Sequence, residues 1–415
     1  MKQKLRKLMR RLSIFIAILG PGIITGSVDN DVGGITTYSV AGALYGYNLL
    51  WALIPSFIVL VIVQEMNARM GMVTGKGLAD LIRESFGVKA TFFIFMSLLV
   101  ADIGNTATEF AGVAGSLEIF GVSKYISVPL AAAFIWLLVV KATYKIAEKV
   151  FLLFSVFLLT YVVSAVMGEP DWTNIGKSII SPATDFGSDY LVMVVGLVGT
   201  TIAPWMQFYM QASVIEKGLK ISDYRYTMVD ILIGCIATVT VAFFIIVACA
   251  STLNVSGVTI VEAKDAAVAL RPLAGDFAAH LFAFGLFIAA VFSATILPLA
   301  SSFYVCEAFG FEAGIDKSFK EAPQFYKLYT SILVIAVLII LIPGAPLVSI
   351  TLWTQVINGV LLPVVLISMM RLVNSKDIMG GYTNGVVSNF VGWGTVTVMI
   401  LLSLGLLVTK FIFGA

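Results

Sequence analysis

Long runs of apolar residues recur along the whole chain, and short polar stretches separate them. A helix that crosses a bilayer needs about 20 mostly apolar residues. The sequence therefore predicts eleven transmembrane helices, over residues 12–44, 47–68, 91–118, 125–141, 148–167, 189–213, 227–252, 275–305, 327–343, 348–370 and 387–410. The longest connections, 168–188 and 253–274, are too short for a separate domain. We expect one transmembrane domain over residues 1–415.

Composition agrees with an all-α polytopic membrane protein. Hydrophobic residues make up 59% of the chain and charged residues 12%, whereas soluble domains carry about 25% charged residues. No basic stripe suggests nucleic acid, and no catalytic set of side chains suggests an enzyme. The three cysteines lie in or beside apolar segments without ligand-like spacing, which is typical of inert buried thiols. The sequence indicates no cofactor and no obligate protein partner.

The distribution of Lys and Arg predicts the orientation in the cell membrane. With a cytoplasmic N-terminus and eleven spans, 21 of the 26 Lys and Arg residues fall on the cytoplasmic side, and the other five are Lys124, Lys177, Lys264, Arg271 and Lys410. Cytoplasmic loops normally carry such an excess. The C-terminus is then expected on the extracytoplasmic side.

Two predicted spans contain helix-breaking residues near their middle. Span one has the stretch TGSVDNDVGG over 25–34, and span six has GTTIAPW over 199–205, where Pro204 frees the carbonyl of Thr200. Irregular backbone at membrane depth is tolerated only where it is buried in protein or lines a wet cavity. We therefore expect helices one and six to be broken. For span six alone, a simple packed kink is the alternative.

The two breaks occupy matching places in two sets of five spans, about 12–167 and 189–370, with an extra helix at about 387–410. Because five is odd, the second set enters the membrane in the opposite sense. This predicts a five-plus-five inverted repeat, the fold of the amino-acid/sodium symporters. Paired interruptions in inverted halves are the best sequence pointer to a transporter's binding site.

Acidic residues at the first break predict a cation as the ligand. Asp29 and Asp31 lie at mid-membrane, where an acid costs about 2.5–3.5 kcal/mol and is functional by default. Carboxylates and freed carbonyls are hard oxygen ligands that suit Mg²⁺, Ca²⁺ or Mn²⁺. The single histidine, His280, lies near the start of span eight, which excludes a histidine-based zinc site.

Further polar residues lie on spans three, seven and ten. Span three carries Asp102, Asn105, Thr106 and Glu109, spaced to share one helix face, and its two acids indicate a polar cavity or an ion route. A structural hydrogen-bonding role is the alternative. Gln355 and Asn358 on span ten could supply neutral oxygens, although a lone amide more often forms hydrogen bonds between helices. Asp230, near the start of span seven, is expected to be an interfacial residue.

Several ordered motifs resemble the Nramp (natural resistance-associated macrophage protein) family of divalent metal transporters. They cover most of the chain: GPG at 20–22 through YGYNLLW at 45–51, GMVTGKGLADLIRE at 71–84, TEFAG at 108–112, LWTQVINGVLLP at 352–363 and IMGGYTN at 378–384. The resemblance implies a transporter that carries its metal as substrate through the lipid bilayer.

The departures from the family pattern are informative. The family's Asp-Pro-Gly-Asn reads Asp31-Val32-Gly33-Gly34, and its Met-Pro-His reads Ala203-Pro204-Trp205. The metal-binding methionine and the histidine implicated in proton movement are thus absent. On span three the family's Asp is Thr106, while its Glu is kept as Glu109. The tenth-helix Gln is kept as Gln355.

The resemblance and the residues together give a predicted site. The expected metal-site residues are Val28, Asp29, Asn30, Asp31, Gly34, Thr200, Ala203 and Gln355, and the expected selectivity or cavity residues are Asp102, Thr106, Glu109, Trp205 and Gln207. An all-oxygen site without a thioether suits a partly hydrated Mg²⁺ ion. The chain looks like the Nramp-related magnesium transporter branch, which implies Mg²⁺ and Mn²⁺ as cargo.

The expected function is uncoupled uptake of Mg²⁺ and Mn²⁺ by alternating access. One alternative is a proton-coupled Mn²⁺/Fe²⁺ symporter whose proton path uses Asp29, Asp102 and Glu109. An amino-acid symporter on the same fold is a third possibility, but acids at 29 and 31 would repel a substrate carboxylate.

Overall fold

The computed structural model describes residues 20–141, 159–180, 187–261, 263–271, 275–315 and 317–412, and every regular element within these ranges is helical. The elements are α2 (Pro21–Val28), α3 (Val32–Tyr45), η1 (Leu50–Ala52), α4 (Leu53–Thr74), α5 (Leu78–Glu118), α6 (Lys124–Lys141), α8 (Leu159–Met167), α9 (Trp172–Ile180), α10 (Ser188–Thr201), α11 (Pro204–Glu216), η3 (Ile221–Asp223), α12 (Tyr224–Cys249), the π-helical turn η4 (Ala250–Asn254), α13 (Ala263–Ala266), η5 (Ala267–Leu270), η6 (Gly275–Phe277), α15 (Ala278–Phe309), α16 (Pro323–Leu341), α17 (Leu347–Val373), α18 (Lys376–Met379) and α19 (Val386–Ile412).

Most of the predicted spans correspond to long apolar helices. Within the described ranges, eight helices are long and apolar enough to cross a membrane, and the shorter apolar helix at Lys124–Val140 matches the predicted fourth span. The predicted span at 12–44 is represented by α2 and α3, and the one at 148–167 by α8. The remainder of those two spans, 12–19 and 148–158, lies outside the described residues.

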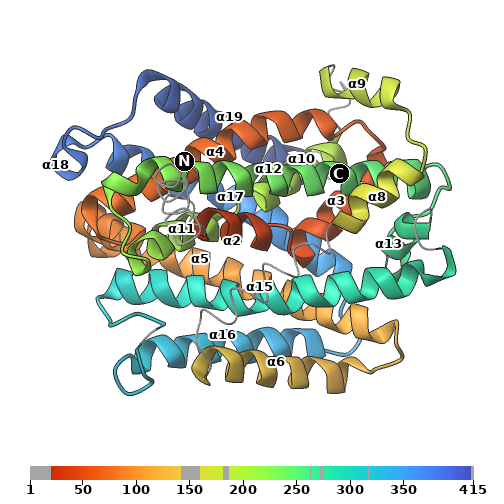
Figure 1. Ribbon diagram of the computed structural model, residues 1–415, viewed down its shortest axis with the longest axis horizontal. Helices are drawn as coiled ribbons and strands as arrows, with labels where there is room; N and C mark the ends of the chain where they lie inside the picture. The colour runs from red at the N-terminus through yellow and green to blue at the C-terminus, as the bar shows by residue number, and fades with distance from the viewer. Residues whose placement is uncertain are drawn as a thin grey trace, which may run out of the picture.

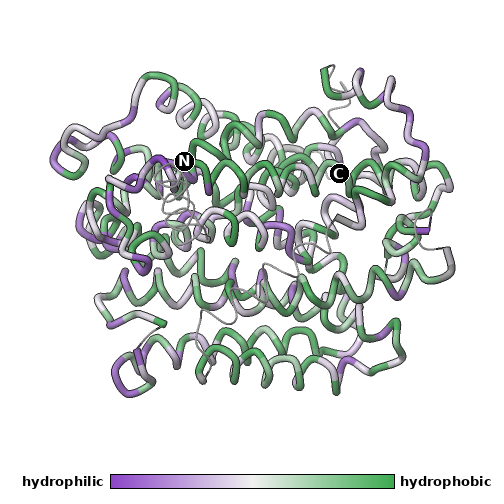
Figure 2. The backbone as a smooth tube through the Cα atoms, in the orientation of Figure 1, coloured by the Kyte–Doolittle hydropathy of each residue, from purple (hydrophilic) through white to green (hydrophobic). Residues whose placement is uncertain are grey.

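The helices run roughly parallel or antiparallel, with their connections gathered at two ends (Figure 1). One end carries α18, and the opposite end carries α9 and α13. The long helices are mostly coloured as hydrophobic, and hydrophilic positions are common in the turns (Figure 2). The chain therefore has the form of a polytopic membrane protein.

Helix α5 begins earlier than the predicted third span. It starts at Leu78, and Gly87, whose φ of 76° is not helical, divides it into a short first segment and a long second segment that contains the predicted span. Glycine reaches this left-handed conformation without the strain that a side chain would add. The two longest predicted connections contain short helices, namely α9 within 168–188 and α13 with η5 within 253–274.

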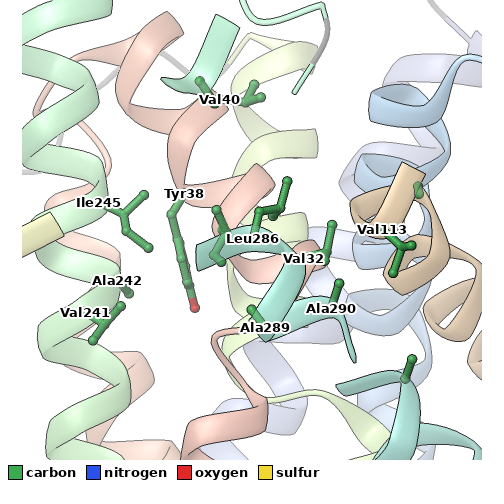
Figure 3. Close-up of a cluster of buried hydrophobic side chains, with 14 of the residues drawn as sticks. Val32, Tyr38, Val40, Val113, Val241, Ala242, Ile245, Leu286, Ala289 and Ala290 are labelled. Atoms are coloured by element: carbon green, nitrogen blue, oxygen red, sulfur yellow. The ribbon is translucent and has the colours of Figure 1, made fainter. Parts of the chain in front are cut away.

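The core around the first break is formed by apolar side chains from several helices. Figure 3 shows Val32 and Tyr38 of α3 among residues of α5, α12 and α15, including Val113, Ile245 and Leu286. Glycines bring α3 and α12 into direct contact, because a Cβ atom at Gly42 would lie 2.9 Å from the Cβ atom of Cys249. The break is thus enclosed by rigid, packed helices.

Candidate metal site

The first break separates α2 from α3. Helix α2 ends at Val28 and α3 begins at Val32, with Asp29, Asn30 and Asp31 between them. Asp31 is the N-cap of α3, and its side chain accepts a hydrogen bond of 2.7 Å from the backbone N–H of Gly34. An acid is well suited to this position because the first turn of a helix has unpaired N–H groups.

Gly34 allows the two half-helices to approach each other. A Cβ atom at this position would lie 2.7 Å from the backbone oxygen of Asp29, closer than ordinary van der Waals contact. The position at which the family carries asparagine therefore has no space for a side chain here. The backbone oxygen of Asp29 fills that space instead.

Several buried oxygen atoms around the break have no hydrogen-bond partner among the described residues. They are both carboxylate oxygens of Asp29, Oδ1 of Asn30, Oε1 of Glu109 and Oγ1 of Thr200. None of these four residues is more than 2% exposed. Buried polar atoms are normally bonded. All five atoms can accept, and a cation or its bound waters would satisfy several acceptors at once.

Three acidic side chains also gather at the break. Glu109 of α5 lies beside it, since its Oε2 atom accepts from the N–H of Val32 at 3.4 Å. Like-charge repulsion acts between Asp31 and both Asp29 and Glu109. In the described part of the chain, none of these three acids forms a salt bridge. The residues around the break thus favour a positively charged ligand.

The site is not a closed metal centre. Among the described residues, no three His, Cys, Asp or Glu side chains converge closely enough to hold a metal by themselves. Structural metal sites are closed by protein ligands. Here most of the oxygen atoms would come from backbone, amides or water, which suits an ion that has to be released.

The second break separates α10 from α11. Helix α10 ends at Thr201 and α11 begins at Pro204, with Ile202 and Ala203 in extended or irregular conformations between them. Ala203 is 3% exposed. The hydroxyl groups of Tyr38 and Thr201 lie 2.9 Å apart and join α3 to α10 beside the two breaks. Tyr38 was not predicted, although it follows Asp31 by seven residues and so lies on the same face, two turns along the helix.

Gln355 of α17 lies between the two breaks. A Cβ atom at Gly33 would lie 2.8 Å from Cδ of Gln355 and 3.0 Å from Oδ1 of Asp31, so the amide is next to the acidic turn. Gly199 of α10 packs directly against the Gln355 backbone and Gly359. Helix α17 therefore contacts α3 at the first break and α10 at the second break.

Span three contributes more than one polar residue to the interior. Asp102 is 2% exposed and accepts from Asn105, and from Ser301 and Tyr304 of α15. Ser301 and Tyr304 were not predicted as site residues, although their three-residue spacing puts them on one helix face. Thr106 donates to the backbone oxygen of Asp102 at 2.8 Å.

Four predicted residues already have other partners. The Val28 oxygen accepts from Ser293 at 3.5 Å, and the Ala203 oxygen accepts from Gln207 at 3.2 Å. Gln207 also accepts from Asn67 of α4 at 2.7 Å. Trp205 stacks at a tilt on Tyr209, with ring centroids 6.2 Å apart. These contacts do not bring Trp205 or Gln207 to the acids of the first break.

Asp230, which was expected only as an interfacial residue, has a structural role that the sequence did not predict. This residue of α12 is fully buried, and its carboxylate accepts from the backbone N–H groups of Gly20, Gly22 and Ile23 at 3.1, 2.6 and 3.4 Å. The unpaired N–H groups at the start of α2 need acceptors. Asp230 provides them and fixes the first half-helix to α12.

A cavity of about 520 Å³ reaches toward the site from the end of the bundle that carries α13. Its lining includes Val32, Gly112, Glu118 and residues 344–349. Val32 packs directly on Gly112 and so separates the cavity from Asp31 and Glu109. On the other side of the break, the small void at Thr25 and Met206 has no room for a water molecule. The cavity thus approaches the break from the end that carries α13 and stops at Val32.

A bundle of apolar helices, two of them broken where they meet around buried acids, defines a membrane transporter with inverted repeats. The chain belongs to the Nramp family: the model described as "Natural resistance-associated macrophage protein-like" matches residues 22–409. As a member of this family the protein is a transporter of divalent metal ions and not an enzyme, and the metal is its substrate.

Solved structures share the fold at low sequence identity. The manganese transporter of Eremococcus coleocola, in complex with an aromatic bis-isothiourea compound, superposes with a TM-score of 0.78 at 20% identity, covering 96% of this chain and 87% of that one. The nucleobase-cation-symport-1 family transporter Mhp1 gives 0.57 at 11% identity, covering 94% and 92%. MhsT, in complex with L-phenylalanine, gives 0.56 at 13% identity, covering 92% and 98%. These likenesses establish the inverted-repeat fold.

Proposed function

We propose that this transporter carries Mg²⁺, and also Mn²⁺, by uncoupled alternating access. The observation that carries the proposal is the set of buried, unpartnered oxygen atoms at the first break, together with alanine at position 203. Hard oxygen ligands without a thioether favour Mg²⁺ and Mn²⁺ over softer metals. The sulfur of Met210, on the same half-helix, accepts from Thr25 at 3.9 Å. That contact points the Met210 sulfur toward α2, at a residue that precedes the acids of the first break.

A partly hydrated ion fits these residues best. Mg²⁺ gives up its waters reluctantly and usually keeps several of them when bound to protein. Waters on a cation donate hydrogen bonds, so they require acceptors. The free oxygens of Asp29, Asn30 and Thr200 are such acceptors, and alanine at 203 occupies less volume than the methionine of the family. We place the ion between the breaks, with Asp31 and Gln355 beside it.

The absence of proton coupling is proposed from two substitutions relative to the family. Trp205 occupies the position of the family's histidine, and Thr106 that of its third-helix aspartate. An inside-negative potential of 100 mV supplies about 4.6 kcal/mol for a divalent ion, from about 2.3 kcal/mol per charge, so entry needs no second driving ion. The alternative is a proton-coupled Mn²⁺/Fe²⁺ symporter that uses the buried acids Asp29, Asp102 and Glu109.

We infer that the N-terminus is cytoplasmic and the C-terminus extracytoplasmic, with repeats at about 12–167 and 189–370 in one domain. The end that carries α18 then faces the cytoplasm, and the cavity at Val32 and Glu118 opens outward. A membrane-impermeant maleimide should label Ser123→Cys on intact cells and leave Lys320→Cys unlabelled. If only Lys320→Cys were labelled, the orientation would be opposite to the one inferred.

Metal uptake by an Asp31→Ala variant in proteoliposomes tests the site. We expect Mg²⁺ flux to fall to the level of empty liposomes, because a carboxylate beside Gln355 is removed. Asp377→Ala is the control, since this acid of α18 is exposed. Undiminished Mg²⁺ flux through Asp31→Ala would refute the proposed site.

A further inference from the structure

A chain of side-chain hydrogen bonds connects α15 with α5 and α17. Ser301 and Tyr304 each donate to Oδ2 of Asp102 at 3.0 Å, and Asn105 donates its Nδ2 to Oδ1 at 2.9 Å. Asp102 is buried, and within the described residues it has no Lys, Arg or His partner. Its carboxylate is therefore held entirely by neutral donors and acts as an acceptor on both oxygens.

The carboxylate determines the orientation of the next amide. A carboxylate that accepts cannot also donate, so the NH₂ group of Asn105 must face Asp102 and its Oδ1 must face away. This Oδ1 atom accepts from Nδ2 of Asn358 at 2.8 Å, and Nε2 of Gln355 lies 3.5 Å from it. Asn358 also donates to Oε1 of Gln355 at 3.0 Å. Each amide thus fixes the orientation of the one that follows.

The last amide of this chain lies at the ion site. Nε2 of Gln355 is the atom closest to the space beside Gly33, and Oδ1 of Asp31 is 3.0 Å from the same point. In this arrangement Oε1 is bonded to Asn358, and an N–H group faces the first break. The opposite orientation of the amide would present an oxygen to the ion.

We propose that Asp102 is a positioning residue that fixes the orientation of the Gln355 amide through Asn105 and Asn358, and thereby sets the ion preference of the site. The inference rests on the proposed function, because it concerns the same ion site. With an N–H group facing the break, Gln355 supplies no direct ligand to the metal. The missing ligand disfavours an Mn²⁺ ion that would bind the amide oxygen directly. It affects Mg²⁺ less, because Mg²⁺ keeps its waters and the free oxygens of Asp29, Asn30 and Thr200 can accept from them.

The substitution Asp102→Asn places a donor at the start of the chain. The Asn105 amide can then rotate so that its oxygen faces this donor, and the Asn358 amide can rotate in response. Oε1 of Gln355 is then free to face the break. We expect the KM for Mn²⁺ to fall relative to that for Mg²⁺ by about tenfold, within the range of coupling measured in shared hydrogen-bond networks. The maximal rate should change less than the KM ratio. Asp377→Asn is the matched control and should leave the ratio unchanged.

A double-mutant cycle separates positioning from a general structural effect. In a Gln355→Ala background the amide that Asp102 orients is missing, so Asp102→Asn should produce no further change in the KM ratio. A shift of the same size in that background, or no shift in either background, overturns the inference. If Asp102→Asn does not fold, Asn358→Leu interrupts the same chain and should shift the ratio in the same direction; an unchanged ratio then overturns it. Wild-type protein that moves neither ion in these vesicles would instead contradict the proposed function.

Discussion

The tight contact at Gly34 leads to a quantitative prediction for Gly34→Ala. The added Cβ atom would lie 2.7 Å from the backbone oxygen of Asp29, and ordinary contact begins at 3.4 Å. The two sides of the first break must therefore separate by about 0.7 Å. Because the atom in contact belongs to the backbone, no side-chain rotation can relieve the contact.

Two effects on stability oppose each other. Alanine is favoured over glycine inside a helix by about 1 kcal/mol, which stabilises α3. Overpacking a well-packed interior costs about 1–3 kcal/mol. The net change at Gly34 should lie between zero and about 2 kcal/mol of destabilisation. Gly394 of α19 is the control, because a Cβ atom there meets nothing within 4 Å and Gly394→Ala should be neutral or stabilising.

The effect on transport should exceed the effect on stability. Functional groups have to be held within about 0.5 Å of their productive positions, and the expected displacement is larger. We expect the KM for Mg²⁺ to rise about tenfold, which corresponds to about 1.4 kcal/mol. The assay is Mg²⁺ uptake in proteoliposomes together with thermal unfolding in detergent. If Gly34→Ala kept the wild-type KM and its melting temperature rose as in Gly394→Ala, the reasoning would be refuted.

Three further variants extend the test. Ala203→Met restores a thioether at the second break, so the KM for Mn²⁺ should fall, Cd²⁺ should become a substrate and Mg²⁺ uptake should weaken; unchanged selectivity would count against a site at this break. Asp230→Ala leaves three N–H groups of α2 without their acceptor, and the melting temperature in detergent should drop by the equivalent of about 1–3 kcal/mol; an unchanged melting temperature would show that the cap is dispensable. Gly34→Asn restores the family's residue but meets the same backbone contact, so we expect it to lose Mg²⁺ uptake without gaining Mn²⁺ preference, and efficient Mn²⁺ transport would contradict this.

The positions of both breaks could be predicted because their causes are local. Two acids and a glycine pair within one apolar run cannot remain in a continuous lipid-facing helix, and α2 indeed ends just before Asp29. Pro204 lacks an N–H group, and it begins α11. In both cases the residue that ends or begins the half-helix is visible in the sequence.

Partners from distant parts of the chain could not be predicted in this way. Asp230 looked interfacial because it lies near a helix start, but its ligands are backbone N–H groups some 210 residues earlier. Asn105 and Asn358 are 253 residues apart, and nothing in their local sequence indicates that they share a hydrogen bond. Such pairs depend on how α5, α12 and α17 pack.

The extent of helix α5 shows a third kind of difference. Hydropathy placed its start at 91, because residues 80–90 include several charged side chains. The range that begins at Leu78 contains a short helical segment before Gly87, and this non-helical glycine separates it from the apolar segment that follows. Apolar runs locate the segment that suits a membrane, and they do not reveal a more polar helical segment that adjoins it at a glycine.

Uptake of Mg²⁺ and Mn²⁺ by the wild-type protein, with internal pH recorded in the same proteoliposomes, tests the central claim most directly. With an inside-negative potential and no pH gradient, both ions should enter and the internal pH should stay at the level of protein-free liposomes. Mg²⁺ that fails to enter, or acidification in fixed proportion to the metal, would contradict an uncoupled magnesium carrier and favour the proton-coupled Mn²⁺/Fe²⁺ symporter.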